Sequence, residues 1–115
     1  YPEYHTSKDN MRLISSRGLQ GAYDVYCEMI EALEYNFIYK NTCLCEPQFG
    51  KRGLYPTVSQ KGNYGDIKGM RDFIAYADGT NDLIEISDRI QVPVKKIIPI
   101  AKKMLENQLI EFVEA

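Results

Sequence analysis

The middle of the sequence holds turn-forming residues that interrupt both helical and strand patterns. Between Phe37 and Asp66 they break every apolar period: Asn41, Pro47, Gly50, Gly53, Pro56, Gly62 and Gly65. We therefore expect a long loop with one or two short strands, near residues 37–39 and 57–59. A loop of this length is uncommon in a compact domain unless it packs on a partner or is functional.

The residues before this loop have the spacing of one long amphipathic helix. Ser15 or Ser16 can cap its start. Apolar side chains then recur at steps of three or four: Leu19, Ala22, Tyr23, Tyr26, Ile30, Leu33 and Phe37. These steps put them on one stripe and predict a helix from about residue 16 to 35. A stripe so rich in aromatic side chains must pack on something, either the second half of the chain or another chain.

The residues after the loop show a regular series of shorter elements. The apolar spacing predicts a helix over about 66–77, ended by Asp78-Gly79, and a second helix capped by Thr80 or Asn81. A turn at 91–93, a third helix over about 94–107 and a strand over 109–114 follow. This layout is that of a winged helix-turn-helix. We expect its wing to be short or missing, because the chain stops after one strand.

Pro99 conflicts with the third helix of this series. A proline about five residues inside a helix removes a hydrogen bond and clashes with the preceding turn. Either the helix kinks, or residues 94–97 form a separate turn and the helix starts near Pro99, where proline is favourable. We favour the second interpretation.

Together these patterns predict a mostly α-helical fold with a few short strands, in the α+β class. We divide the chain into residues 1–65, with the long helix and the irregular loop, and residues 66–115, with the winged helix-turn-helix layout. The composition suits a soluble globular chain, because 44% of the 115 residues are hydrophobic and 26% are charged. Apolar runs such as residues 97–101 are far shorter than the roughly 20 residues that a membrane span needs.

The cysteines indicate a reduced, cytoplasmic chain. Their number is odd and they lack the spacing of a disulfide framework: Cys27, Cys43 and Cys45. Cys43 and Cys45 form a single C-x-C pair, which is weak support for zinc without a second pair. We interpret them as two semi-buried thiols in a loop or short strand.

Four lysines form one basic strip on the expected third helix. At 3.6 residues per turn, Lys95 falls together with Lys102, and Lys96 with Lys103. A lysine strip on a recognition-type helix can contact phosphates. Residues 66–115 carry seven basic and nine acidic side chains, however, and this helix has no arginine. A solvated face or a protein contact is therefore preferred over nucleic acid.

The single histidine of the sequence, His5, lies in a segment that resembles part of a known enzyme family. Residues 1–9 read YPEYHTSKD, and residues 46–56 read EPQFGKRGLYP. With a helix between them and a winged helix after them, these strings resemble the C-terminal part of bacterial zinc aminopeptidase-like proteins of the M28 class, associated with polysaccharide biosynthesis. The resemblance implies that His5 is a zinc ligand and that Tyr4 lies close to the reacting carbonyl group.

The same resemblance implies that the zinc site is incomplete in this chain. A catalytic zinc needs about three protein ligands and a carboxylate base, which in this family lie upstream, in segments absent here. The spacing of Glu3, Asp9 and Glu46 does not support them as further ligands. We expect a piece of a larger protein, inactive alone, whose partners are the missing upstream catalytic domain and, for the parent, a peptide substrate.

Three functions remain open at this stage. In the first, the parent is a zinc-dependent aminopeptidase-like hydrolase, and this chain supplies one ligand and an accessory domain. In the second, residues 66–115 are a DNA-binding winged helix. In the third, the same residues are a protein-contact or dimerisation domain, which would make the protein a homo-oligomer or bring it to another partner. We favour the first for the parent and the third for residues 66–115.

Overall fold

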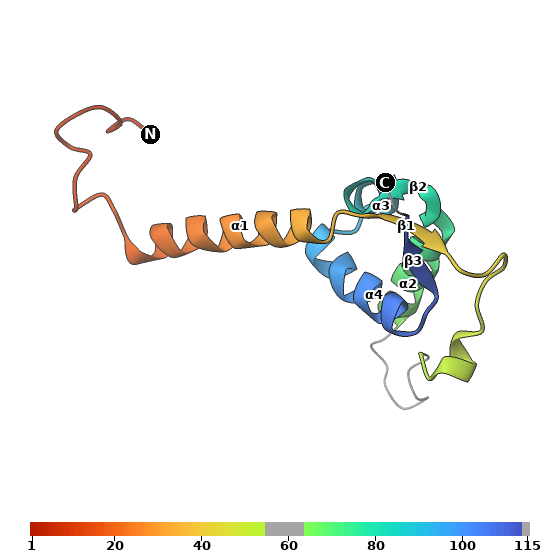
Figure 1. Cartoon of the computed structure of the whole chain (residues 1–115). Coiled ribbons are helices and arrows are strands. Elements are labelled where there is room, and N and C mark those ends of the chain that lie inside the picture. The colour runs from red at the N-terminus through yellow and green to blue at the C-terminus, as the bar shows by residue number, and fades with distance from the viewer. Residues whose placement is uncertain (55–63, 114–115) are drawn as a thin grey trace.

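The chain consists of a long projecting helix and a small body of helices and strands (Figure 1). The structure is a computed structural model that describes residues 1–54 and 64–113. Its helices are α1 (Ser16–Glu34), α2 (Tyr64–Tyr76), α3 (Leu83–Ile90) and α4 (Val94–Glu106), with a short 3₁₀ turn at Phe49–Arg52. Its strands are β1 (Ile38–Asn41), β2 (Asp78–Asp82) and β3 (Ile110–Phe112). The expected mostly helical α+β fold is confirmed, whereas the strand expected near 57–59 lies outside the described residues.

The strands form one antiparallel sheet in the order β2-β1-β3. β1 is the central strand: Ile38 pairs with Asp82 of β2, and Tyr39 pairs with Phe112 of β3. The strands expected near 37–39 and 109–114 are therefore present. Residues 38–41 come from the start of the predicted loop, yet they form the centre of the sheet that the C-terminal helices cover.

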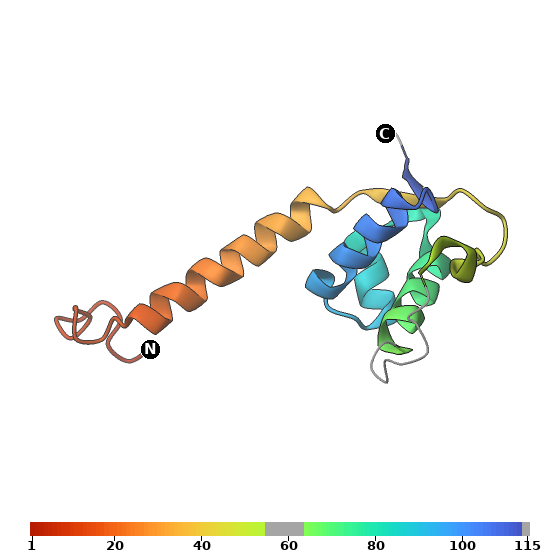
Figure 2. The same cartoon turned by 90° about the horizontal axis from the view of Figure 1, so that it is seen from below.

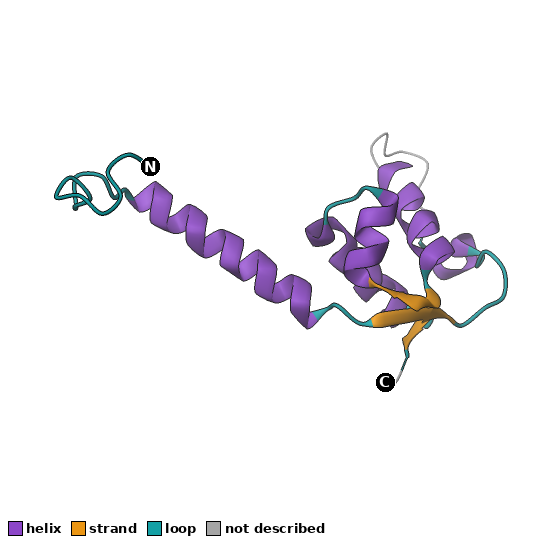
Figure 3. Ribbon diagram, turned by 90° about the horizontal axis from the view of Figure 1, so that it is seen from above, coloured by secondary structure: helices purple, strands orange, loops and turns teal. Residues whose placement is uncertain are grey.

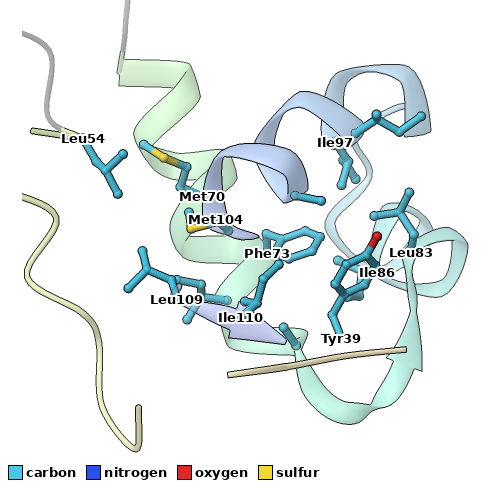
Figure 4. Close-up of a cluster of buried hydrophobic side chains, with 14 of the residues drawn as sticks. Tyr39, Leu54, Met70, Phe73, Leu83, Ile86, Ile97, Met104, Leu109 and Ile110 are labelled. Atoms are coloured by element: carbon cyan, nitrogen blue, oxygen red, sulfur yellow. The ribbon is translucent and has the colours of Figure 1, made fainter. Parts of the chain in front are cut away.

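The core of the body lies between this sheet and the helices α2, α3 and α4 (Figure 4). Its largest fully buried side chains are Tyr39, Phe49, Met70, Phe73, Leu83, Ile86, Ile97, Met104 and Leu109. The rings of Tyr39 and Phe73 meet edge to face with their centroids 5.7 Å apart, which joins the sheet to α2. Burying a side chain of this size contributes about 1.5–3 kcal/mol, so this cluster holds the body together.

The start of α3 differs from the prediction. The capping residue is Asp82, not Thr80 or Asn81: its side chain accepts from the amide of Glu85, and the Glu85 side chain accepts from the amide of Asp82. Thr80 and Asn81 lie in β2, a strand that the sequence did not indicate. That strand is short and polar, and Gly79 at a φ of 91° turns the chain into it directly after α2.

Pro99 lies inside a continuous helix, so the predicted start of a helix near Pro99 was wrong. α4 begins at Val94 and runs through Pro99 to Glu106. Pro99 itself is exposed, while Ile97, Ile98, Ala101 and Met104 are buried on the face that packs on the core. Burial of this apolar face on both sides of the proline outweighs the one backbone hydrogen bond that proline removes.

α1 projects from the body and buries none of its residues (Figures 1 and 2). Its bounds agree with the predicted helix, and Ser15 caps it by accepting from the amide of Gly18 at 3.1 Å. The apolar stripe of α1 stays exposed, so it does not dock on the second half of the chain, which was one of the two expectations. Within the described ranges, no helix has the length and apolar character needed to cross a membrane.

Candidate functional site

Tyr4 and His5 lie together in an exposed turn ahead of α1. Their ring centroids are 4.0 Å apart, and the ring of Tyr1 meets Tyr4 at 5.7 Å. Both side chains are exposed, and His5 has a positive φ of 59°. Such a conformation is uncommon for a residue with a side chain. The turn therefore presents the two predicted site residues side by side on the surface.

Thr6 and Asp9, two polar neighbours of His5 in the sequence, shape the turn. The hydroxyl of Thr6 donates to the carbonyl oxygen of Glu3 at 2.7 Å. The carboxylate of Asp9 accepts from the hydroxyl of Tyr1 at 2.7 Å, and this hydrogen bond raises the pKa of Tyr1. These local bonds close the segment on itself and leave the His5 ring beside Tyr4.

The described residues do not assemble a zinc site around His5. No group of three or more His, Cys, Asp or Glu side chains within residues 1–54 and 64–113 could hold a metal ion. Cys27, Cys43 and Cys45 are free thiols, and Cys43 donates to the carbonyl oxygen of Cys45 at 3.2 Å. His5 can therefore supply at most one ligand, and a zinc site would need the others from a different segment.

Two of the four strip lysines pair with α1. Lys95 Nζ lies 3.1 Å from Glu28 Oε1, and Lys102 Nζ lies 3.8 Å from Glu31 Oε1. Lys102 also lies over the ring of Tyr35, 4.2 Å from its centroid. Tyr35 first, and Glu31 less strongly, raise the pKa of Lys102. The basic strip thus exists, and one side of it faces α1 of the same chain.

Lys96 and Lys103, the other two strip lysines, are exposed to solvent. They lie beside the pair that contacts α1, about one quarter turn round α4. The structure therefore divides the predicted strip into a half that holds α1 and a half that is solvated.

A joint at Asn36, which the sequence did not single out, fixes the direction in which α1 leaves the body. Its side-chain amide donates to Asp82 Oδ2 at 3.1 Å, and its side-chain oxygen accepts from the amide of Ile84 at 3.0 Å. The hydroxyl of Tyr39 donates to the carbonyl oxygen of Tyr35 at 2.8 Å. These bonds tie the end of α1 to the start of α3 and to β1. The sequence signal was only an asparagine at a helix end, which is common.

A surface cavity of about 840 Å³ lies between the segment 41–46 and α2. Glu46 and Arg71 form an ion pair at its rim, with Oε1 and Nε 3.2 Å apart. Asn41 donates to the carbonyl oxygen of Ile74 at 2.7 Å, while its own side-chain oxygen is buried without a partner among the described atoms. The mixed apolar and charged lining favours no single ligand chemistry.

Two family profiles match the chain and meet at the end of α1. Residues 37–112 match a family described as winged helix-turn-helix. Residues 1–36 match a domain of unknown function (DUF4910). The boundary between the two matches coincides with the joint at Asn36.

Similarity to longer proteins covers both parts of the chain. A protein from Clostridium acetobutylicum, named as a polysaccharide biosynthesis protein with an aminopeptidase-like domain, is 33% identical over 112 residues, which are 96% of this chain and 26% of that protein. A crystal structure assigned to a peptidase from Clostridium acetobutylicum superposes with a TM-score of 0.78 and 32% identity, over 96% of this chain and 24% of that one. The chain spans about a quarter of the length of each.

Proposed function

The chain belongs to the winged helix-turn-helix family, and on that premise we propose that it is the C-terminal segment of an aminopeptidase-like zinc hydrolase of the M28 class. Residues 1–36 contribute to the catalytic domain, and the winged helix is an accessory interaction module. One observation carries this proposal: similarity to a single protein with an aminopeptidase-like domain runs through 96% of the chain. The match to the domain of unknown function covers the segment with Tyr4 and His5.

In this proposal His5 is one zinc ligand and Tyr4 acts on the substrate. A neutral imidazole at His5 would hold zinc through one ring nitrogen, and zinc bound there would supply an activated water and Lewis-acid polarisation of a carbonyl group. The hydroxyl of Tyr4, whose ring adjoins His5, donates a hydrogen bond to the carbonyl oxygen of a peptide substrate. The 115-residue chain alone is inactive, because the other ligands and the carboxylate base come from the rest of the protein.

The winged helix makes protein contacts in this proposal and does not bind nucleic acid. The ion pairs of Lys95 and Lys102 with Glu28 and Glu31 support this view, because they neutralise half of the basic strip within the chain. Phosphate binding needs cations that are free to neutralise phosphates, because this releases the counterions condensed on the nucleic acid. We place the protein in the cytoplasm, in keeping with its three free thiols.

The test of the hydrolase role uses the full-length protein that contains this chain. We expect His5→Ala to lower both the bound zinc and the rate of hydrolysis of peptide substrates by at least about tenfold. Loss of a residue that only hydrogen-bonds to a zinc ligand already lowers metal affinity about tenfold, and loss of the ligand itself should lower it more. Lys8→Ala, an exposed neighbour in the same turn, is the matched control and should change neither. Zinc content and activity that survive His5→Ala would overturn the proposal.

The test of the interaction role is a DNA titration of the 115-residue chain at low salt. We expect no binding to duplex DNA, and no difference when Lys95, Lys96, Lys102 and Lys103 are all changed to alanine. Salt-sensitive binding that these substitutions abolish would instead assign the winged helix to DNA.

A further inference from the structure

An exposed apolar stripe runs along one face of α1. We define this stripe by five side chains: Leu19, Tyr23, Tyr26, Ile30 and Leu33. Each of them is 57–68% exposed, whereas α1 as a whole has no buried residue. Single exposed apolar side chains are ordinary, but a contiguous row of this kind marks an interaction surface.

The contact with the winged helix uses the opposite side of α1. At 3.6 residues per turn, Glu28 and Tyr35 lie about half a turn from the middle of the stripe. Lys95 and Lys102 of α4 contact this polar side. The body reaches α1 only near its C-terminal end, as Figure 3 shows. The stripe therefore faces away from the winged helix and is free for a second body.

The residues up to the end of α1 are too exposed to be a domain of their own. Every residue from 1 to 34 is exposed or half-buried, and none contributes to the core. A unit this small buries too little surface to fold alone. The family match to residues 1–36 also ends where α1 ends. Residues 1–36 are thus the edge of a domain whose core lies in other residues.

The length of the relatives indicates which part of the protein packs against the stripe. About three quarters of each relative lies outside the region that this chain matches. The fold of this chain, α1 included, superposes on the matched quarter of the solved relative with a TM-score of 0.78. The position of α1 on the winged helix is therefore compatible with a chain about four times as long.

We propose that the stripe on α1 docks on an apolar surface of the aminopeptidase-like domain of the same polypeptide, an inference that rests on the proposed function. Burial of five such side chains removes apolar area from water and so favours docking. The hydroxyls of Tyr23 and Tyr26 need polar partners at the edge of that surface. α1 is then a two-sided bridge, with the catalytic domain on its stripe and the winged helix on its polar side.

The experiment is photo-crosslinking in the full-length protein. A photoreactive benzoylphenylalanine replaces Tyr26 on the stripe, or Ile30 as a second stripe position. The same group at Asp24, on the polar side and ahead of the contact with α4, is the matched control. A mixture of isotopically light and heavy protein separates crosslinks within one polypeptide from those between two. The far-ultraviolet spectrum of each variant checks that it folds.

We expect both stripe positions to crosslink to the aminopeptidase-like domain within one polypeptide, and Asp24 not to do so. Mixed light–heavy crosslinks would assign the stripe to a second copy and overturn the inference. No protein crosslink at either stripe position, or equal crosslinking from Asp24, would also overturn it. The readout needs neither zinc nor activity, so loss of the hydrolase role and loss of the docking role give different results.

Discussion

α1 and α4 are both amphipathic helices, yet among the described residues only α4 buries its apolar face. α4 buries Ile97, Ile98, Ala101 and Met104 against the core, whereas α1 buries nothing. Residues 37–54 and 64–113 form a body around a buried core, whereas residues 1–34 contribute no buried side chain to it. The difference teaches that an apolar period shows that a helix has a partner, but not where in the protein the partner lies.

The largest effect is expected from removing one aromatic ring from the core of the body and, for comparison, one from α1. Phe73→Ala empties a fully buried position in the core and should lower the free energy of unfolding by about 3–5 kcal/mol. Tyr26→Ala removes a ring that is 65% exposed and should change it by less than about 0.5 kcal/mol in the 115-residue chain. Urea unfolding followed by tyrosine fluorescence measures both. Equal losses would mean that α1 is already packed in this chain.

A second test uses the pH dependence of the core. Burial raises the pKa of Tyr39 to about 12, whereas an unfolded tyrosine titrates near pH 10. Below pH 10 the phenol is neutral in both states and its contribution is complete. Between pH 10 and 12 the unfolded state ionises first, so stability falls, by about 2–3 kcal/mol at 1.4 kcal/mol per unit.

Tyr39→Phe should flatten this alkaline fall in stability, as measured by urea midpoints between pH 9 and 12. Tyr26, whose side chain is exposed, is the matched control, and Tyr26→Phe should leave the fall in place. A fall that persists unchanged in Tyr39→Phe would show that another group causes it.

A third test loosens the joint between the two regions. Asn36→Ala removes the hydrogen bonds to Asp82 and to the amide of Ile84, which should cost about 1 kcal/mol of stability. Asn10→Ala removes bonds that stay within the exposed turn before α1 and should cost almost nothing. Thermal unfolding compares the two variants. A neutral Asn36→Ala would mean that the direction of α1 is not fixed by this side chain.

The smallest effect concerns the ion pairs between α1 and α4. A double-mutant cycle on Lys95 and Glu28 should give a coupling of about 0.2–0.5 kcal/mol that fades at high salt, because both side chains are more than half exposed. The pair Lys68 and Asp72 within α2 is a control of similar type. Amide hydrogen exchange in the last turns of α1 should become faster when the pair of Lys95 and Glu28 is removed, and should not change when the pair of Lys68 and Asp72 is removed. A response to both pairs would argue against a specific contact.

The sequence predicted the parts of the fold that depend on local periodicity. The bounds of α1, the helix series after the loop and the strand β3 were indicated by spacing, and a short strand was expected near residues 37–39, where β1 lies. β2 was missed because Asp78–Asp82 has no apolar alternation. The start of α4 was misplaced because the preference of proline for the first turn of a helix was weighed above the packing of the whole helix face.

The candidate site was less accessible from sequence alone. The pairing of Tyr4 with His5 and the lysine strip could be named from spacing and resemblance. The joint at Asn36 could not, because its partners Asp82 and Ile84 are more than 40 residues away along the chain. The contact of Lys95 with Glu28 spans 67 residues and has no local signal either.

Hydrogen exchange on the 115-residue chain and on the full-length protein tests the central claim most directly. We predict that amides of residues 64–113 are equally protected in both, since the core that they form with Tyr39, Phe49 and Leu54 lies within this chain. Amides of residues 16–34 should exchange rapidly in the 115-residue chain and become protected in the full-length protein, where we propose that α1 docks on the aminopeptidase-like domain. Rapid exchange of α1 in both proteins would contradict the account, and so would full protection of α1 in a monomeric 115-residue chain.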